Sequence, residues 1–242
     1  MRILVILIAT ASITGAAPHP LAEKCGSTSG ITATPFWLTA RDGVHLYAVE
    51  AGSGDVGVVL AHESPADLCG WLPYMATLEG SGLRVLAFDF RGFGDSDRPA
   101  ANRDFYAYDR DLEAAVARLR SDGAQKVFLV GASYGGVAVM TYGSALPISG
   151  VVSLSGETHI TGARLNALAA VPRLHAPLLI VGSRHDRNLS VPDALRLLRA
   201  AGSHDKRTAL YPGGFHGWDI VEDAPYAAKA RALVLAWLRQ RA

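Results

Sequence analysis

The sequence predicts an α/β protein in which a mostly parallel central sheet is covered by helices on both faces. Short apolar runs of strand length alternate with longer segments of helical periodicity. One of these runs ends at a Gly-x-Ser-x-Gly turn, residues 131–135, and a helix-compatible segment follows it. The 242 residues, half of them hydrophobic, suffice for one domain with a sizeable core.

The first residues differ in character from the rest of the chain. Arg2 precedes an apolar run, residues 3–13, and small residues follow at 15–17. This order predicts a secretory signal peptide over residues 1–17, cleaved near Ala16 or Ala17. The run is shorter than the roughly 20 apolar residues that span a bilayer. The alternative is a buried first strand.

The two cysteines leave two possibilities open. Glu23 and Lys24 stand before Cys25, where a lipoprotein signal needs small residues, so we expect no stable membrane anchor after cleavage. The expected location is secreted or periplasmic. In such an oxidising compartment Cys25 and Cys69 can form a disulfide, and the alternative is two separate thiols.

Eight segments have the pattern of strands. The first two flank the polar turn at 41–43 and have the pattern of a hairpin. The third is almost continuously apolar, as expected of a strand buried on both faces. The eight segments are 36–39, 45–50, 56–61, 83–90, 127–130, 151–154, 178–181 and 208–211.

Helical segments lie between and after these strands. Apolar residues recur at i, i+3, i+4 and i+7 from Leu112 to Leu119. Residues 137–145 are a small-residue segment compatible with a helix. Pro192 opens another helix, and residues 227–239 form the last one.

The Gly-x-Ser-x-Gly turn predicts a nucleophile. Gly131 and Gly135 lack a Cβ, so the backbone can turn sharply and the strand and helix can approach closely. The turn would lift the Ser133 hydroxyl above the end of its strand. The Tyr134 N–H opens the next helix, where the dipole favours a developing negative charge. A chance match in a glycine-rich chain is the alternative that the other site residues must exclude.

A serine hydroxyl needs a base to take its proton, and that base needs an acid to orient it. Asp186 follows the strand at 178–181, and His216 lies on a glycine-rich loop after the last strand. Both positions fall at carboxyl ends of strands, where open α/β sheets bind ligands. The chain order Ser133, Asp186, His216 is the order this motif predicts. Glu157 is the weaker alternative for the acid.

Composition limits the partners. The formal net charge of +1 provides no basic stripe for nucleic acid, so no nucleic-acid partner is expected. The predicted chemistry needs no metal and no organic cofactor. We expect a small-molecule ester or acyl substrate. Tyr134, Trp71, Phe215 and Trp218 are candidate apolar walls, and the alternative is that these rings fill the core. The oligomeric state leaves no trace in the sequence.

Two further motifs resemble those of the α/β-hydrolase superfamily. His62 matches the histidine of that family's His-Gly-x loop, and residues 89–96, Asp-Phe-Arg-Gly-Phe-Gly-Asp-Ser, resemble its D-x-R-G-x-G-x-S segment. The resemblance spans about residues 36–238 and implies the α/β-hydrolase fold. It implies that the Ser64 N–H joins the Tyr134 N–H in an oxyanion hole. Trp71 matches a tryptophan near the start of the first helix and is a candidate substrate contact.

The chain departs from the family pattern at two places. Glu63 replaces the glycine after His62. By resemblance to dienelactone hydrolases Glu63 would line the pocket, and a solvated loop carboxylate is the alternative. Residues 157–176 leave room for about one helix where capped members carry a cap domain. We therefore expect a capless, dienelactone-hydrolase-like or esterase-like member with an open site.

These patterns predict an exported, carboxylesterase-like serine hydrolase that cleaves carboxylic ester or related acyl bonds through an acyl-enzyme. Thioester, lactone or dienelactone hydrolysis and perhydrolysis on the same triad are alternatives. A non-catalytic binding protein with a hydrolase fold is the alternative of another class. The predicted organisation is a signal peptide at 1–17, an N-terminal connector at 18–35 and the hydrolase domain at 36–242.

Overall fold

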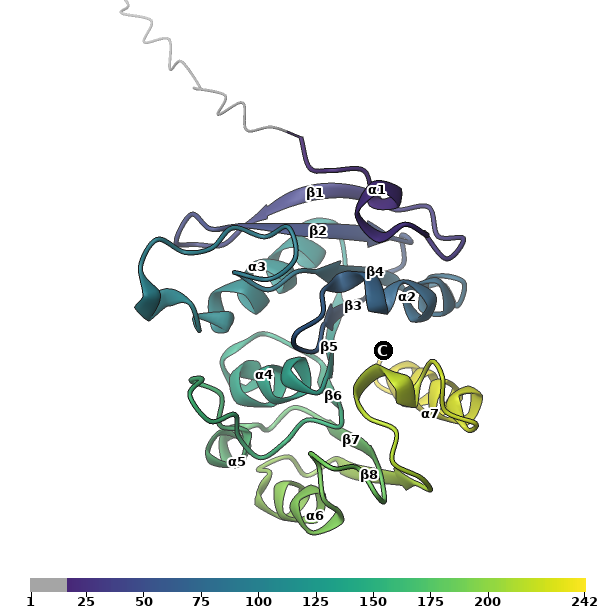
Figure 1. Cartoon of the computed structure of the whole chain (residues 1–242). Coiled ribbons are helices and arrows are strands. Elements are labelled where there is room, and N and C mark those ends of the chain that lie inside the picture. Colours follow the sequence, from purple (N-terminus) through teal and green to yellow (C-terminus); the bar gives the residue numbers. More distant parts are fainter. Residues whose placement is uncertain (1–16) are drawn as a thin grey trace, which may run out of the picture.

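An eight-stranded sheet forms the centre of the protein (Figure 1). The computed structural model describes residues 17–242, apart from the side chain of Arg103. Apart from Ala17, the predicted signal peptide therefore lies outside the described residues. The strands, in their order across the sheet, are β1 (Thr34–Thr39), β2 (His45–Ala51), β4 (Arg84–Phe88), β3 (Val56–Ala61), β5 (Lys126–Ala132), β6 (Gly150–Leu154), β7 (Leu178–Ser183) and β8 (Lys206–Tyr211).

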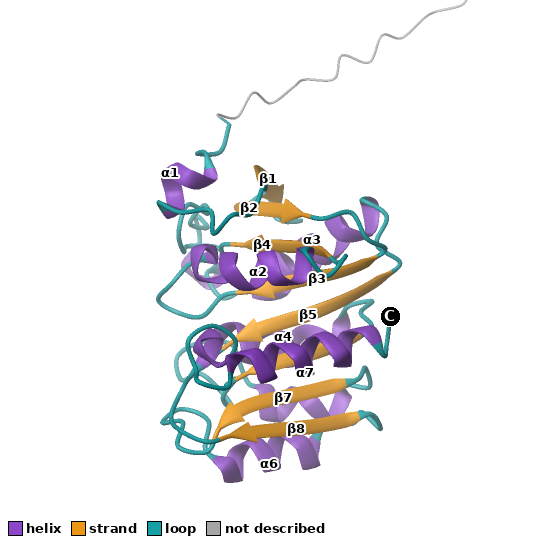
Figure 2. Cartoon of the chain, turned by 90° about the vertical axis from the view of Figure 1, so that its right-hand side faces the viewer, coloured by secondary structure: helices purple, strands orange, loops and turns teal. Residues whose placement is uncertain are grey.

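The sheet is mostly parallel, as predicted. β1 and β2 form an antiparallel hairpin, and β2 pairs antiparallel with β4. Every other neighbouring pair, from β4·β3 to β7·β8, is parallel. The arrowheads of β5, β7 and β8 accordingly point to the same side in Figure 2. This direction gathers the loops after these strands at one edge of the sheet, where ligands bind in such folds.

Helices cover both faces of the sheet (Figure 1). Apolar side chains of α3, α4, α5 and α6 pack on one face, and those of α1, α2 and α7 on the other. The α-helices are α1 (Leu21–Cys25), α2 (Leu72–Glu79), α3 (Tyr108–Ser121), α4 (Tyr134–Tyr142), α5 (Ala167–Ala170), α6 (Val191–Ala200) and α7 (Ala227–Arg239). Over residues 17–242, none of these helices combines the length and the apolar character that crossing a membrane requires.

The elements agree with the predicted pattern at most positions. β3 and α7 have the predicted bounds, whereas β4 ends at Phe88, two residues earlier than predicted. The strand stops there because the Phe90 N–H donates to the His62 ring, 2.9 Å away, instead of continuing the ladder. Between β6 and β7 only α5 and the 3-10 turn Val171–Arg173 are present, so the absence of a substantial cap is confirmed for the described residues.

The N-terminal segment is tied to the domain by a disulfide. Cys25 and Cys69 are bonded, with their Cα atoms 5.5 Å apart, which decides between the two possibilities the sequence left open. The bond joins α1, which the sequence pattern did not predict, to the 3-10 helix η1 (Leu68–Trp71). The part of the predicted connector that contains α1 thus lies against the sheet domain.

Candidate active site

Ser133 sits at a strained turn between β5 and α4. Its backbone has φ 47° and ψ −112°, a conformation that non-glycine residues rarely adopt. The flanking glycines permit the turn, since a Cβ on Gly131 would lie 2.3 Å from the Gly135 carbonyl oxygen. The chain therefore turns from strand to helix within one residue, and the Ser133 hydroxyl stands at the carboxyl end of β5.

The structure brings Ser133, His216 and Asp186 into one hydrogen-bonded chain. The His216 Nε2 lies 2.7 Å from the Ser133 Oγ, and its Nδ1 lies 3.0 Å from each Asp186 carboxylate oxygen. Ser133 is 8% exposed, and the Asp186 side chain is 1% exposed. The predicted nucleophile, base and acid, 83 and 30 residues apart along the chain, are therefore in direct contact.

The neighbours of His216 and Asp186 set the pKa values of these two groups. Burial lowers the pKa of the His216 imidazole, but the hydrogen bond and charge of Asp186, helped by Glu63 and Glu157, raise it above its ordinary value overall. Burial raises the pKa of the Asp186 carboxyl, and the His216 hydrogen bond together with the Asn188 N–H outweighs that effect and lowers it. Asp186 is therefore ionised and favours a protonated His216.

Asn188 is a site residue that the sequence analysis missed. Its N–H donates to the Asp186 Oδ1 over 2.8 Å, and the Leu189 N–H donates to the same oxygen over 3.2 Å. Its side-chain nitrogen lies 3.3 Å from the His216 Nε2. The sequence signal that could have identified Asn188 is its place two residues after Asp186 in a loop, because an Asp side chain commonly accepts from the N–H of the residue two positions later.

Glu157, the alternative acid, lies near His216 but is not hydrogen-bonded to it in the described structure. Burial raises the pKa of Glu157, the Asp186 charge adds to that rise, and the His216 charge opposes it. The ring nitrogen that would need an acid, Nδ1, is already bonded to Asp186. The geometry therefore favours Asp186 over Glu157.

The loop after β3 lies against the start of α4. A Cβ on Gly135 would lie 2.2 Å from the Ala61 carbonyl oxygen and 2.6 Å from that of His62. Tyr134 is the first residue of α4, where N–H groups have no partner within the helix. Ser64 follows in the same loop, two residues after His62, and is exposed. The two predicted oxyanion donors are therefore carried by segments that touch each other.

His62 fixes this loop from within the core. It is fully buried, and its Nδ1 lies 2.8 Å from the Glu63 carbonyl oxygen, while its Nε2 accepts from the Phe90 N–H. Burial lowers the pKa of the His62 imidazole, so the ring is neutral, donates through Nδ1 and accepts through Nε2. His62 thus links the loop after β3 to the loop after β4.

Glu63 connects the loop after β3 to the histidine loop. Its Oε2 accepts from the Trp218 N–H over 3.3 Å, and a Cβ on Gly217 would lie 1.7 Å from the same oxygen. Burial raises the pKa of the Glu63 carboxyl, and its charge contributes to the raised pKa of His216. Glu63 is therefore half-buried between the two loops and is not a freely solvated carboxylate.

The predicted aromatic residues differ in burial: Trp71 is fully buried, whereas Tyr134, Phe215 and Trp218 are half-buried. Trp71 is fully buried and packs edge-to-face on Trp218, with 5.7 Å between ring centres, so its prediction as a substrate contact is corrected to a core position. The reason is that Trp71, the last residue of η1, packs into the core on the α2 and α7 face. Trp218 is half-buried beside His216, and the half-buried Tyr134 hydroxyl bonds to that of Tyr108.

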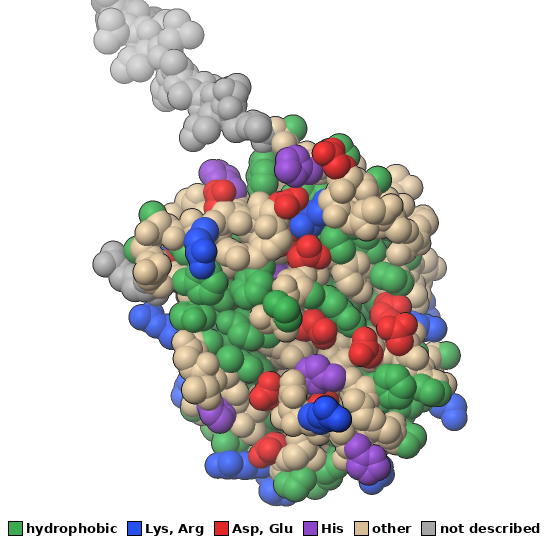
Figure 3. Space-filling view, viewed as in Figure 1, with side chains coloured by type: hydrophobic (Ala, Val, Ile, Leu, Met, Phe, Trp, Pro, Cys, Tyr) green, Lys and Arg blue, Asp and Glu red, His purple; other side chains and the backbone are tan. Residues whose placement is uncertain are grey.

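Acidic side chains dominate the surroundings of His216. The charges of Asp186, Glu63 and Glu157 all raise its pKa. Figure 3 shows acidic side chains next to histidine in the middle of the visible face. Within residues 17–242, no cluster of three or more His, Cys, Asp or Glu side chains has the arrangement that could hold a metal ion.

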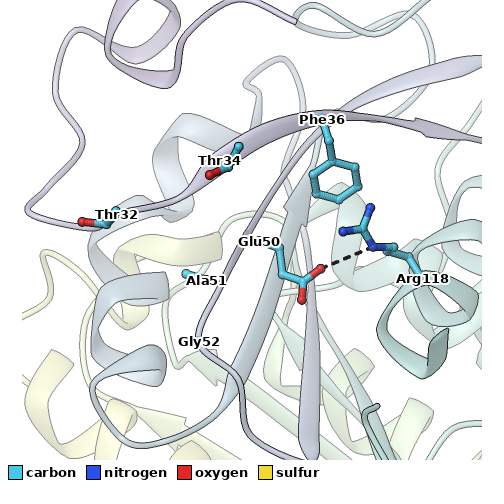
Figure 4. A pocket seen from close by; sticks show the side chains of 7 residues that line it. All are labelled: Thr32, Thr34, Phe36, Glu50, Ala51, Gly52 and Arg118. Carbon is cyan, nitrogen blue, oxygen red and sulfur yellow. Dashed lines mark ion pairs between the residues drawn. The ribbon is translucent and has the colours of Figure 1, made fainter. Parts of the chain in front are cut away.

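A separate hollow of about 320 Å³ lies far from this edge of the sheet. Its lining includes Glu50 and Ala51, at the end of β2 that pairs with the beginning of β4, so it opens at the amino edge of the parallel strands. Figure 4 shows the Arg118 guanidinium beside Glu50 and the Phe36 ring. The hollow contains no serine, cysteine or histidine, so we place the chemistry at the Ser133 edge.

The sheet topology and the serine turn define the class of protein as an α/β hydrolase. The model of the alpha/beta hydrolase family matches residues 58–241, and the chain belongs to this family.

Curated relatives of two kinds are similar to the chain. Epoxide hydrolase A of Mycobacterium tuberculosis is 40% identical over 105 residues, which are 42% of this chain and 32% of that protein. Bifunctional epoxide hydrolase 2 of Rattus norvegicus is 33% identical over 43% of this chain and 18% of its own length. The chain thus spans less than a third of these epoxide hydrolases. A non-heme haloperoxidase of Rhodococcus erythropolis is 29% identical over 85% of this chain and 67% of that protein.

Solved structures share the fold. The esterase Pf2001 of Pyrococcus furiosus superposes with a TM-score of 0.74 at 16% identity, covering 93% of this chain and 97% of that one. A bromoperoxidase from Bacillus anthracis gives a TM-score of 0.70 at 19% identity, covering 86% and 100%. At these identities the likeness concerns the fold.

Proposed function

We propose that the protein is an exported serine hydrolase that cleaves carboxylic esters or related acyl bonds through an acyl-enzyme. The observation that carries this proposal is the contact chain from the Ser133 Oγ through His216 to Asp186, with 2.7 Å and 3.0 Å between successive partners. A hydroxyl bonded to an imidazole that an ionised carboxylate orients is the arrangement that activates serine as a nucleophile.

The reaction uses these groups in two half-steps. His216 Nε2 takes the Ser133 proton while Oγ bonds to the carbonyl carbon, and the tetrahedral oxyanion is held by the N–H groups of Tyr134 and Ser64. The imidazolium then gives its proton to the leaving alkoxide oxygen as the carbon–oxygen bond breaks. Water repeats the sequence: His216 takes its proton, hydroxide attacks the acyl carbon, and Ser133 leaves with that proton.

Two observations support export. Residues 1–17 have the charge, apolar length and small residues of a signal peptide. The Cys25–Cys69 disulfide is of the kind that persists in oxidising compartments. A cleaved product starting near Ala17 or Pro18 in the extracellular or periplasmic fraction would support this location. Retention of residues 1–16 on a cytoplasmic product would contradict it.

Serine at the turn favours acyl transfer over epoxide opening. Attack of the Ser133 Oγ on an epoxide carbon would leave an ether, which has no carbonyl for water to attack. Attack on an ester leaves another ester, which the same His216 and oxyanion donors can hydrolyse. The similarity to epoxide hydrolases therefore does not extend, in our proposal, to their named substrate.

The test combines a covalent probe with a substrate panel. A fluorophosphonate should label the purified protein at Ser133, and p-nitrophenyl acetate should be hydrolysed. Ser133→Ala should abolish labelling and lower kcat on the order of 10⁶-fold, because the nucleophile is lost. Ser121→Ala, which changes an exposed serine at the end of α3, is the matched control. Full activity of Ser133→Ala, or an unlabelled parent without esterase activity, would refute the proposal.

Perhydrolysis is the second candidate, favoured by the similarity to the Rhodococcus haloperoxidase over most of this chain. Hydrogen peroxide would replace water and bond to the acyl carbon after giving a proton to His216. His216 would pass that proton to the Ser133 Oγ as the acyl–serine bond breaks, which releases a peracid. The peracid would then oxidise bromide and be reduced to the acid. Bromination that requires ester, peroxide and Ser133 together would support this reaction, and bromination by Ser133→Ala would contradict it.

A further inference from the structure

The N-terminal arm, residues 17–33, is held against the sheet domain by several independent contacts. Leu21 and Ile31 are buried, 4% and 6% exposed, in the core on the α2 and α7 face. The Tyr47 hydroxyl donates to the His19 carbonyl oxygen over 2.7 Å. The Cys25–Cys69 disulfide fixes the end of α1. The arm is therefore a packed part of the domain.

This arm places one buried cation, Lys24, beside a buried carboxylate. The Lys24 side chain is 4% exposed, and its Nζ lies 2.9 Å from the Asp89 Oδ2. Asp67 and Asp95 carboxylates lie 3.4 Å and 3.7 Å from the same Nζ. The backbone makes room for this pair, because a Cβ on Gly94 would lie 2.0 Å from Asp89 Oδ2 and 3.0 Å from Lys24 Nζ.

Asp89 in turn holds two loops of the active-site edge. Its Oδ1 accepts from the Leu68 N–H over 2.8 Å, and its Oδ2 accepts from the Asp95 N–H over 2.9 Å. Leu68 ends the loop that carries Ser64 and begins η1. Asp67, the other carboxylate near Lys24, caps η1 by accepting from the Cys69 N–H over 2.9 Å. The ion pair and the predicted oxyanion donor are therefore joined through one short loop.

We propose that Lys24 is a positioning residue for acyl transfer: it neutralises Asp89, and the ionised Asp89 holds the loop that presents the Ser64 N–H. This inference rests on the proposed function. A fully buried carboxylate without a cation is unstable and takes up a proton. Protonation turns one Asp89 oxygen into a hydroxyl, which is a weaker acceptor than a carboxylate oxygen, so the bond to one of its two N–H partners would weaken.

The test compares Lys24→Met, which keeps the length of the side chain without its charge, with Lys24→Arg and the double variant Lys24→Met/Asp89→Asn. Lys229→Met, on the exposed surface of α7, is the matched control. Circular dichroism and thermal unfolding establish folding. kcat and KM for p-nitrophenyl acetate are measured across pH, and fluorophosphonate labelling reports Ser133 independently.

Lys24→Met should lower kcat on the order of tenfold at neutral pH with little change in KM. This is less than the roughly 100- to 1,000-fold cost of removing an oxyanion donor, because the loop is loosened and not deleted. The kcat of Lys24→Arg should lie between that of Lys24→Met and that of the parent. The charged and titratable groups around Asp89 are Lys24, Tyr47, His62, Asp67 and Asp95.

The pH dependence separates positioning from a general structural role. Burial raises the pKa of Asp89, and Lys24 opposes that rise. The kcat deficit of Lys24→Met should therefore be largest at low pH and shrink as pH rises and Asp89 ionises. In the double variant, residue 89 does not titrate, and the deficit should not depend on pH. A purely structural role would give the same deficit at every pH in both variants.

The outcomes are distinguishable. An active parent with a Lys24→Met variant that matches Lys229→Met in kcat and pH profile would overturn this inference alone, and so would a Lys24→Arg variant less active than Lys24→Met. An unlabelled, inactive parent would overturn the proposed function itself. If Lys24→Met does not fold, the neutral but polar Lys24→Gln takes its place: a kcat deficit that shrinks as pH rises supports positioning, and a deficit that is the same at every pH, parental kcat or failure to fold overturns it.

Discussion

Two aspartates at the same edge of the sheet show how a partner decides what a carboxylate does. Asp186 follows β7 and Asp89 follows β4, both are buried, and both accept backbone N–H groups. Asp186 faces an imidazole, which can gain and lose a proton near neutral pH. Asp89 faces the ammonium of Lys24, which stays charged there.

The pKa of each carboxyl follows from this difference. The His216 hydrogen bond and the Asn188 N–H lower the pKa of Asp186 in spite of its burial. Burial raises the pKa of Asp89, with only Lys24 as a neighbouring ammonium among the groups that oppose it. The comparison teaches that one edge of the sheet contains both a proton-transfer chain and a fixed ion pair that holds a loop.

The largest expected effect is on the Asp186 side. Asp186→Asn should lower kcat on the order of 10⁴-fold, because the amide neither stabilises the imidazolium nor selects the tautomer. Ester hydrolysis and circular dichroism should show an inactive but folded protein. Glu157→Gln is the matched control and should retain most of its activity. A reversed order of the two variants would make Glu157 the acid.

On the other side, Asp89→Asn should affect stability more than Asp186→Asn does. It leaves the Lys24 ammonium, 4% exposed, without its nearest counter-charge. Breaking a buried pair in this way costs about 3–5 kcal/mol. Urea unfolding monitored by tryptophan fluorescence measures the loss. An unfolding midpoint equal to that of the parent would show that the pair contributes nothing to stability.

The disulfide that holds the arm should contribute somewhat less. It closes a loop over a sequence separation of 44 residues, so Cys25→Ser/Cys69→Ser should lower the free energy of unfolding by about 2–4 kcal/mol. The reduced parent should match this double variant in urea unfolding. If the reduced parent were as stable as the oxidised one, the arm would be held without a contribution from the disulfide, by Lys24, the Tyr47–His19 hydrogen bond and its apolar contacts.

The smallest expected effect concerns the pH profile on the Asp186 side. Neutral His216 is required as the base, so activity should be lost as pH falls through the His216 pKa, which is raised above its ordinary value. Glu63 contributes to that rise, so Glu63→Gln should move the acidic limb of kcat/KM to lower pH. The limb is measured with p-nitrophenyl acetate. A shift to higher pH would contradict the assigned charge effect.

The sequence by itself determined the fold class and the three contact-chain residues. Ser133, Asp186 and His216 each follow a strand whose apolar pattern is local and therefore readable. Parallel strands must bring their carboxyl ends to one edge, so strand direction alone predicts that the three meet. The sharp turn at Ser133 could also be predicted from its flanking glycines, because the whole motif lies within five consecutive residues.

Only the tertiary structure decided the contacts between distant segments. The disulfide, the Lys24–Asp89 pair and the burial of Trp71 depend on how the arm and η1 pack, and no periodicity along the chain records that packing. In the sequence Lys24 has the pattern of a solvated charge. Its side chain is nevertheless buried, because it forms an ion pair with Asp89, 65 residues further along the chain. Burial and pairing are properties of the folded neighbourhood, and a residue's type does not contain them.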